Sequence, residues 1–210
     1  MKKICKDGLF ITFEGGEGSG KTSVINLIAN ELKNDGYDVI LTREPGGIKI
    51  AEQIREVILC CENTDMEAET EALLFAASRT EHLKKKVLPA LMQNKIVLCD
   101  RYLDSSLVYQ GITRGLGIEM ILKANCFAFK YLPKRTYFLD VTPGVGLNRI
   151  KNRDNLNRLD LEKRSFHDQV YNGYIEIANK FSDRIKKIDG ERQMELVAKD
   201  ILEDIKTLLK

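Results

Sequence analysis

Short apolar runs alternate with helical patterns along the whole chain. The apolar runs predict five strands, at residues 9–13, 38–42, 96–99, 136–139 and 184–188. Apolar positions spaced by three and four residues predict helices between the strands, one of them near 48–59, and an amphipathic helix at 196–208 closes the chain. A longer helical stretch covers residues 73–88, and Pro89 is expected to kink or interrupt it.

The order of these elements predicts the fold class. Strand and helix alternate, and the strands are apolar throughout, which is typical of a parallel sheet covered by helices. We therefore expect an α/β protein with a doubly wound, parallel five-stranded sheet and helices on both faces. No linker or repeat divides residues 1–210, so we expect a single domain whose ligands bind at the carboxyl ends of the strands.

Composition narrows the classes of partner. Hydrophobic residues make up 43% of the chain and charged residues 30%, and a formal net charge of +2 gives no indication of a nucleic-acid or membrane surface. The N-terminus lacks the apolar stretch of a signal peptide, and the longest apolar run, 72–77, is too short to cross a bilayer. No zinc-site spacing links the cysteines, which we expect to be buried, reduced thiols in the cytoplasm: Cys5, Cys60, Cys61, Cys99 and Cys126.

The most specific motif directly follows the first predicted strand. It matches the phosphate-binding pattern G-x-x-x-x-G-K-[ST] and reads Gly15-Gly16-Glu17-Gly18-Ser19-Gly20-Lys21-Thr22. The glycines let backbone N–H groups turn toward phosphate oxygens, and the helix that follows adds partial positive charge. We expect Lys21 at the β- and γ-phosphates of ATP and the Thr22 hydroxyl at Mg²⁺. The alternative, a glycine-rich turn with a chance lysine, does not account for the strand, the spacing and the helix together.

A carboxylate at another strand end fits the same chemistry. Asp100 follows the predicted strand 96–99, where an acid of the Walker B type holds Mg²⁺ or its water ligands. An aspartate at this position is also a common helix N-cap, and that alternative stays open.

Other motifs separate the classes of P-loop protein. The guanine-reading pattern [NT]-K-x-D is absent, since Asn94-Lys95 continues as Ile96-Val97, and no D-x-x-G switch follows the P-loop. The length leaves little room for a motor or transporter ATPase. A small-molecule kinase is favoured, because arginines at several strand ends suit two anionic substrates. Another nucleotide or deoxynucleoside kinase, or a nucleotide-dependent switch, remains the alternative.

Short segments in order along nearly the whole chain carry a family resemblance. They are Phe13-Glu14-Gly15 with the P-loop, Thr42-Arg43-Glu44-Pro45-Gly46-Gly47, Leu74-Phe75-Ala76-Ala77-Ser78-Arg79, Asp100-Arg101-Tyr102 with Tyr109-Gln110-Gly111, Leu139-Asp140-Val141-Thr142-Pro143 and Asn157-Arg158-Leu159-Asp160. The sequence resembles the thymidylate kinase family in its bacterial form. This implies a P-loop NTPase fold and direct in-line transfer from ATP, with Mg²⁺, to dTMP. It also implies a homodimer.

The resemblance assigns roles in the acceptor site. Phe75 would stack on the thymine ring and Arg79, one helical turn later, would hydrogen-bond its edge; core packing and a solvated charge are the alternatives. Arg43 and Arg101 would clamp the 5′-phosphate, unless they form surface ion pairs. Further contacts would come from Glu17 at the 3′-hydroxyl, from Tyr109 beneath the deoxyribose, and from the base-pocket residues Ser105, Ser106 and Gln110.

Residues 149–164 are rich in arginine, lysine and asparagine. Such a composition is typical of a solvated surface, but a kinase also needs a mobile lid that excludes water and adds positive charge. Some family members carry an arginine inside the P-loop, and Gly18 stands in its place here. The lid is therefore expected to supply that charge, from Arg153 first and from Arg149 or Arg158 as alternatives. Arg149 would otherwise pack over adenine as a cofactor-binding residue.

Overall fold

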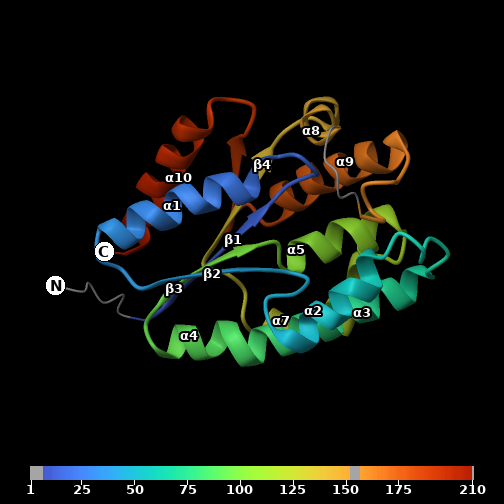
Figure 1. Cartoon of the computed structure of the whole chain (residues 1–210), viewed down its shortest axis with the longest axis horizontal. Helices are drawn as coiled ribbons and strands as arrows, with labels where there is room; N and C mark the ends of the chain where they lie inside the picture. Colours follow the sequence, from blue (N-terminus) through green and yellow to red (C-terminus); the bar gives the residue numbers. More distant parts are fainter. Residues whose placement is uncertain (1–6, 152–156, 210) are drawn as a thin grey trace.

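Five parallel strands form the centre of the protein in the computed structural model, which describes residues 7–151 and 157–209. The sheet has the order β2-β3-β1-β4-β5 and contains β1 Leu9–Glu14, β2 Val39–Arg43, β3 Ile96–Asp100, β4 Arg135–Asp140 and β5 Ile185–Asp189 (Figure 1). Each predicted strand is confirmed, with its ends shifted by no more than one residue. The doubly wound parallel sheet is confirmed as well.

Helical segments occupy the connections. In chain order they are α1 Lys21–Asn34, α2 Lys49–Leu59, α3 Ala68–His82, the π-helical η1 Leu83–Val87, α4 Leu88–Met92, α5 Leu103–Ser106, the π-helical η2 Leu107–Thr113, α6 Ile118–Ala124, α7 Cys126–Phe129, α8 Pro143–Ile150, α9 Arg164–Lys180 and α10 Met194–Leu208.

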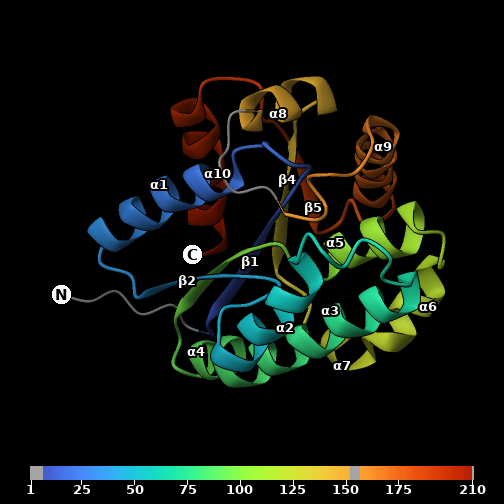
Figure 2. The ribbon, with the colours of Figure 1, turned by 45° about the vertical axis from the view of Figure 1, so that its right-hand side comes forward.

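The two faces of the sheet bury separate hydrophobic clusters. Because side chains alternate along a strand, Ile11 and Phe13 of β1 pack against α1 and α10, whereas Phe10 faces α3, η1 and α9. Figure 2 shows α1 and α10 on one side of the sheet and α3, α4 and α7 on the other. Both faces are therefore covered, which explains why the strands are apolar without alternation.

Of the two outcomes expected at Pro89, a kink or an interruption of the long helical stretch, the interruption is wrong. The chain stays helical from α3 through η1 into α4, so the proline does not interrupt it. Instead, the preceding turn changes to π-helical hydrogen bonding, with the Leu88 N–H donating to the Leu83 carbonyl. A π turn of this kind accommodates the missing N–H of Pro89, which lies in the first turn of α4.

The expectation of buried cysteines is wrong for part of the set. Cys99 in β3 is buried, but Cys60 is half-buried and Cys61 and Cys126 are exposed. Cys61 lies in the turn after α2 and Cys126 begins the short α7, so apolar sequence neighbours do not place them in the core. Cys5 lies outside the described residues. No helix within residues 7–151 and 157–209 is long and apolar enough to cross a membrane.

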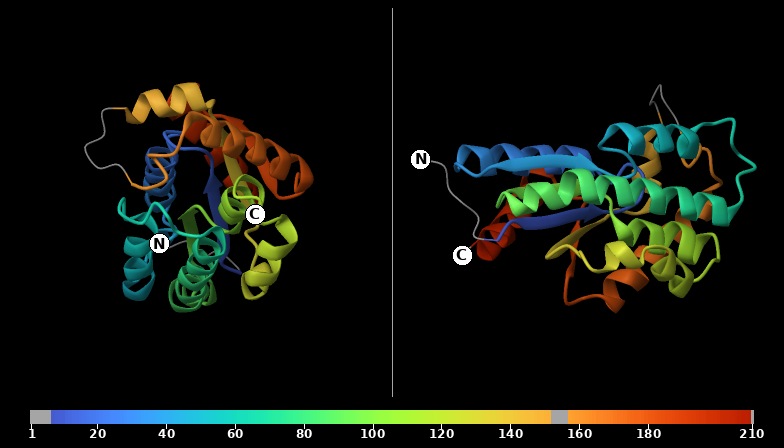
Figure 3. Two further views of the ribbon diagram at one scale, coloured as in Figure 1. Left: turned by 90° about the vertical axis from the view of Figure 1, so that its right-hand side faces the viewer. Right: turned by 90° about the horizontal axis from the view of Figure 1, so that it is seen from below.

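Strand register brings distant motifs to one edge of the sheet. Arg43 at the end of β2 pairs with Asp100 at the end of β3, and Asp100 pairs with Phe13 of β1, just before the P-loop. The left view of Figure 3 looks onto this carboxyl edge, with α8 and α9 along one side and α2 and α3 along the opposite side. Ligands of parallel α/β sheets bind at this edge.

A buried polar cluster connects α5 with β1, with β4 and with the residue before β5. Both carboxylate oxygens of Asp104 accept hydrogen bonds of 2.7 Å from the Arg184 guanidinium. Arg184 also reaches the Thr136 hydroxyl, which is 2.8 Å from the hydroxyl of Thr12. The Asp104 carboxylate is 1% exposed, so the bidentate pair with Arg184 is needed to offset the free-energy cost of burying its charge.

Removing that partner is expected to destabilise the fold strongly. Arg184→Met should lower the free energy of unfolding by about 3–5 kcal/mol, because it leaves a buried carboxylate without a counter-charge. The matched control is Lys187→Met on β5, which removes an ion pair with Asp140 whose lysine side chain is 54% exposed. That change should stay within about 1 kcal/mol. Urea unfolding followed by circular dichroism measures both, and equal losses would contradict the assignment.

Candidate active site

The P-loop connects β1 to α1 and wraps around the side chain of its own lysine. Lys21 Nζ donates hydrogen bonds to the carbonyls of Gly15, at 3.0 Å, and Gly16, at 3.1 Å, and to Ser19 Oγ, at 3.1 Å. Burial, reinforced by the positive charge of Arg101, lowers the pKa of the Lys21 ammonium. Lys21 is therefore held inside the loop by oxygen acceptors, next to the N-terminus of α1.

The first turn of α8 rests directly on the P-loop. A Cβ on Gly18 would lie 2.0 Å from the carbonyl oxygen of Gly146, and a Cβ on Gly146 would lie 2.2 Å from that of Glu17. Gly18 also has a left-handed backbone with φ of 69°. The structure thus has no room for a side chain at position 18. From the same helix, Arg149 Nη1 lies 3.4 Å from the carbonyl oxygens of both Gly18 and Gly190.

Two side chains that carry oxygen atoms, Thr22 and Asp100, meet beside the P-loop. The Thr22 hydroxyl at the start of α1 donates a 2.9 Å hydrogen bond to Asp100 Oδ2 at the end of β3. The sequence predicts both residues as ligands of Mg²⁺, and a hydroxyl and a carboxylate side by side are the ligand types that this hard cation prefers. The residues therefore fit the ion.

Arg101 lies at the centre of the site. Its backbone is left-handed, with φ of 68°, which is uncommon for a residue with a side chain. Its guanidinium donates to Glu17 Oε1 at 2.6 Å, to the Tyr174 hydroxyl at 3.0 Å and to Ser105 Oγ at 3.2 Å. The Tyr109 hydroxyl donates to the same Glu17 oxygen at 3.0 Å. Burial acts to raise the pKa of Glu17, but the charges of Arg101 and Lys21 outweigh it, and the pKa is lowered.

Two more arginines line the hollow next to the P-loop. Arg43 Nη2 pairs with both oxygens of Glu52, at 2.9 and 3.0 Å, and its side chain is half exposed. Arg55, which no motif indicates, donates to the Pro45 carbonyl at 2.9 Å. Burial, followed by the charge of Arg43, lowers its pKa. No sequence pattern identifies Arg55, because its partner is a backbone carbonyl in the loop before α2.

These cations line a hollow of about 390 Å³ together with the P-loop. A volume of this order suits a small-molecule site. Five residues of its lining also line a narrower cavity of about 90 Å³: Glu17, Glu44, Arg55, Arg101 and Asn157. The two spaces therefore adjoin at a charged junction.

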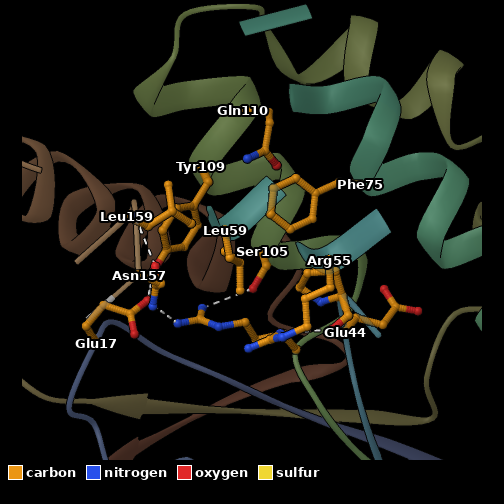
Figure 4. A pocket seen from close by; sticks show the side chains of 12 residues that line it. Glu17, Glu44, Arg55, Leu59, Phe75, Ser105, Tyr109, Gln110, Asn157 and Leu159 are labelled. Atoms are coloured by element: carbon orange, nitrogen blue, oxygen red, sulfur yellow. Dashed lines mark hydrogen bonds and ion pairs between the residues drawn. The ribbon is translucent and has the colours of Figure 1, made fainter. Parts of the chain in front are cut away.

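The narrower cavity, which we call the slot, has apolar walls (Figure 4). Phe75 lies on one side and Tyr109 with Leu159 on the other, and Gln110 lies at the end opposite Glu17. Ser105 also lines the slot. The structure thus brings Phe75, Ser105, Tyr109 and Gln110 together as the sequence predicts, although their roles toward a base stay predictions.

Arg79 and Ser106 lie behind the slot rather than in its lining. Arg79 is 1% exposed. Its Nε donates to Glu44 Oε2 at 2.7 Å and its Nη1 to Asn125 Oδ1 at 2.6 Å, while its Nη2 donates to Ser106 Oγ at 3.0 Å and to the Tyr102 carbonyl at 3.1 Å. A direct hydrogen bond from Arg79 to the edge of a base therefore stays a prediction. The observed partners show that Arg79 connects α3 with the residues behind the slot.

The candidate lid arginines separate in the structure. Arg158 is 4% exposed and bonds to Glu71, while its Nε donates to the Ile58 carbonyl at 2.9 Å. This arrangement attaches Arg158 to α2 and α3 and gives no support to a phosphate contact. Arg149 lies at the P-loop, as described above. Arg153 lies outside the described residues.

A second glutamate, Glu14, shares two hydrogen-bond partners with Arg101, the hydroxyl groups of Ser105 and Tyr174. The carboxylate oxygens of Glu14 accept hydrogen bonds from the Tyr102 N–H at 2.8 Å, from Ser105 Oγ at 2.6 Å and from the Tyr174 hydroxyl at 2.9 Å. Burial and then the charge of Asp104 raise the pKa of Glu14 to about 7. Sequence patterns give only its place at a strand end, because its partners come from distant segments.

Comparison with known proteins places the chain in a family. The family model for thymidylate kinase matches residues 13–201. The chain belongs to the thymidylate kinase family. A relative from Oceanobacillus iheyensis described as thymidylate kinase is 53% identical, with 96% of this chain and 91% of the relative covered. A thymidylate kinase from Shouchella clausii is 50% identical, with 97% of each covered.

A solved structure supports the same family membership. The crystal structure of thymidylate kinase from Ehrlichia chaffeensis superposes with a TM-score of 0.78 at 31% sequence identity. The match covers 94% of this chain and 98% of that one. Family membership therefore agrees with the motifs and with the P-loop geometry described above.

The contact between α8 and the P-loop predicts a sharp difference between two glycines. Gly146→Ala should lower kcat/KM for ATP by roughly 10²-fold, because the new Cβ displaces loop backbone by a distance on the order of 1 Å. Gly144→Ala, in the same helix, should change little, since its Cβ meets only the Arg164 guanidinium at 3.6 Å. Steady-state kinetics with varied ATP measure both. Equal effects would show that the close approach is unimportant.

The raised pKa of Glu14 predicts a pH dependence of stability. A folded-state pKa of about 7, above the usual 4.5, means that the folded protein binds this proton more tightly than the unfolded chain. The associated stability is full below pH 4.5 and is lost as the pH rises through 7. Glu14→Gln should flatten this loss in urea-unfolding series measured across that range.

Glu191→Gln is the control for that series. Hydrogen bonds from Thr142 lower the pKa of Glu191, so its contribution has the opposite sign and is lost as the pH falls toward the acid side. The slope between pH 4.5 and above 7 should therefore match that of the unsubstituted protein. An unchanged slope in Glu14→Gln would assign the pH dependence to other groups.

Proposed function

We propose that this enzyme transfers the γ-phosphoryl group of ATP to dTMP, forming ADP and dTDP, with Mg²⁺. One observation carries the proposal: the phosphate-binding hollow and the apolar slot adjoin at Glu17, Arg55 and Arg101. A donor triphosphate in the hollow and a monophosphate whose base enters the slot would place their phosphates at this junction. Membership of the thymidylate kinase family supports dTMP as that monophosphate.

The donor side fits ATP. P-loop N–H groups and Lys21 would bind the β- and γ-phosphates. A hollow of about 280 Å³, lined among others by Arg149, Gly190 and Val24, continues from the P-loop and suits the adenine. Thr22 and Asp100 would hold Mg²⁺, which supplies positive charge at the phosphate oxygens when bound.

The acceptor side fits a deoxynucleotide. Arg43, Arg55 and Arg101 would bind the 5′-phosphate, and Phe75 would stack on the base. Glu17 would accept a hydrogen bond from the 3′-hydroxyl. Tyr109, hydrogen-bonded to Glu17 and packed against Arg101, would lie beneath the deoxyribose and disfavour a 2′-hydroxyl.

Positioning and charge account for the chemistry. The acceptor oxygen is already anionic near neutral pH, so in-line attack on the γ-phosphorus needs no strong base. The surrounding cations stabilise the charge on the transferring group without reorganisation. Residues 149–164 would act as the lid, with Arg153 supplying further charge. A single domain, a homodimer and a cytoplasmic location also stay predictions.

A coupled ADP-release assay tests the function. With ATP and Mg²⁺, dTMP should stimulate ADP release, whereas thymidine, which has no phosphate for the arginines to bind, should not. Lys21→Ala, purified in the same way, controls for contaminating kinases and should lose the signal. Release with thymidine but not dTMP would indicate a nucleoside kinase. ATP binding without acceptor-dependent release would indicate a nucleotide-dependent switch.

A further inference from the structure

A buried carboxylate, Glu71, lies behind the end of the slot. It is on α3, one helical turn before Phe75, and it is completely buried. Its Oε1 accepts a 2.8 Å hydrogen bond from Gln110 Nε2. Its Oε2 accepts hydrogen bonds from Arg158 and, at 3.3 Å, from Arg114. No motif in the sequence singles Glu71 out, and the function proposed above does not use it.

The charge state of Glu71 decides how Gln110 is oriented. Burial acts to raise the pKa of Glu71, but hydrogen bonds from Gln110 and Arg158 and the charge of Arg114 outweigh it, and the pKa is lowered. An ionised carboxylate only accepts hydrogen bonds. The NH₂ group of the Gln110 amide must therefore face Glu71, although the two ends of an amide are otherwise hard to tell apart.

The planar geometry of the amide then determines which atom of Gln110 faces the slot. Because the amide is planar, turning Nε2 toward Glu71 turns Oε1 away from it. Figure 4 shows the Gln110 oxygen on the side of the Phe75 ring, within the slot. Gln110 lies in the π-helical η2, and the wider π turn presents Tyr109 and Gln110, consecutive residues, to the same cavity. The end of the slot is thus a hydrogen-bond acceptor.

We propose that Glu71 is a positioning residue for base specificity, which fixes the Gln110 amide so that the slot accepts a hydrogen bond from a ring N–H. Thymine and uracil carry such an N–H at N3. Cytosine has an unprotonated N3, so two acceptors would face each other without a proton between them, and both would be buried unpaired. The inference rests on the proposed function, because it takes the base to lie beside Phe75.

Glu71→Gln tests this directly. Arg158, which donates to Oε2 of Glu71, should keep the oxygen of the new amide on its own side, so the NH₂ group faces Gln110. Gln110 must then accept, and its own NH₂ group turns into the slot. The ratio of kcat/KM for dTMP to that for dCMP should fall at least about tenfold, with a gain for dCMP as well as a loss for dTMP. A merely structural defect would lower both substrates together.

The double substitution Glu71→Gln with Gln110→Glu provides a rescue. A carboxylate at 110 presents an acceptor in either orientation, and the exchange preserves the formal charge of the cluster. The dTMP preference should return to within about threefold of the starting ratio. Arg114→Lys is the matched control, because it alters a partner of Glu71 but keeps the positive charge beside it and leaves Gln110 in place, and it should leave the ratio unchanged.

Each outcome decides the proposal. An unchanged ratio in Glu71→Gln, or an equal fall in Arg114→Lys, would show that Glu71 only anchors its neighbours. If Glu71→Gln does not fold by circular dichroism, Gln110→Met decides: it leaves the ion pairs of Glu71 in place and should still lower the ratio, whereas a retained ratio overturns the inference. Failure of the proposed function would show separately, as absent dTMP-dependent ADP release in the unsubstituted protein.

Discussion

The register between three parallel strands is the constraint on which the site depends. Pairing of β1 with β3, and of β3 with β2, aligns the ends of all three strands at one edge. The P-loop follows β1, and Asp100 and Arg43 are the last residues of β3 and β2, so strand pairing brings residues that are far apart in sequence close together. A shift of one residue in either pairing would turn the side chains of a strand to the opposite face and dissolve the arrangement.

Around that edge, positive side chains are held by carboxylate or carbonyl oxygens of the protein itself. Arg101 is fixed by Glu17, Arg43 by Glu52, and Lys21 by carbonyl oxygens of its own loop. Each cation is thereby oriented before any phosphate arrives, which lowers the entropy lost on binding.

The sequence allowed the sheet and the phosphate loop to be predicted closely, because both depend on local patterns. Strands buried on both faces stand out as apolar runs, and the P-loop follows from spacing alone. The roles of Glu14, Arg55 and Glu71 could not be predicted in this way, since their partners lie on other elements. The placement of Arg79 behind the slot has the same cause: a helical spacing fixes the face of a helix, not which neighbour captures a guanidinium.

The contact between Gly18 and Gly146 has a consequence for how such enzymes diverge. A catalytic arginine cannot be moved into the P-loop by one substitution, because any side chain at position 18 meets the backbone of α8. Helix α8 has to withdraw first, and that withdrawal also carries Arg149 away from the loop. A side chain at position 18 and the present position of α8 therefore exclude each other, so a change at one requires a change at the other.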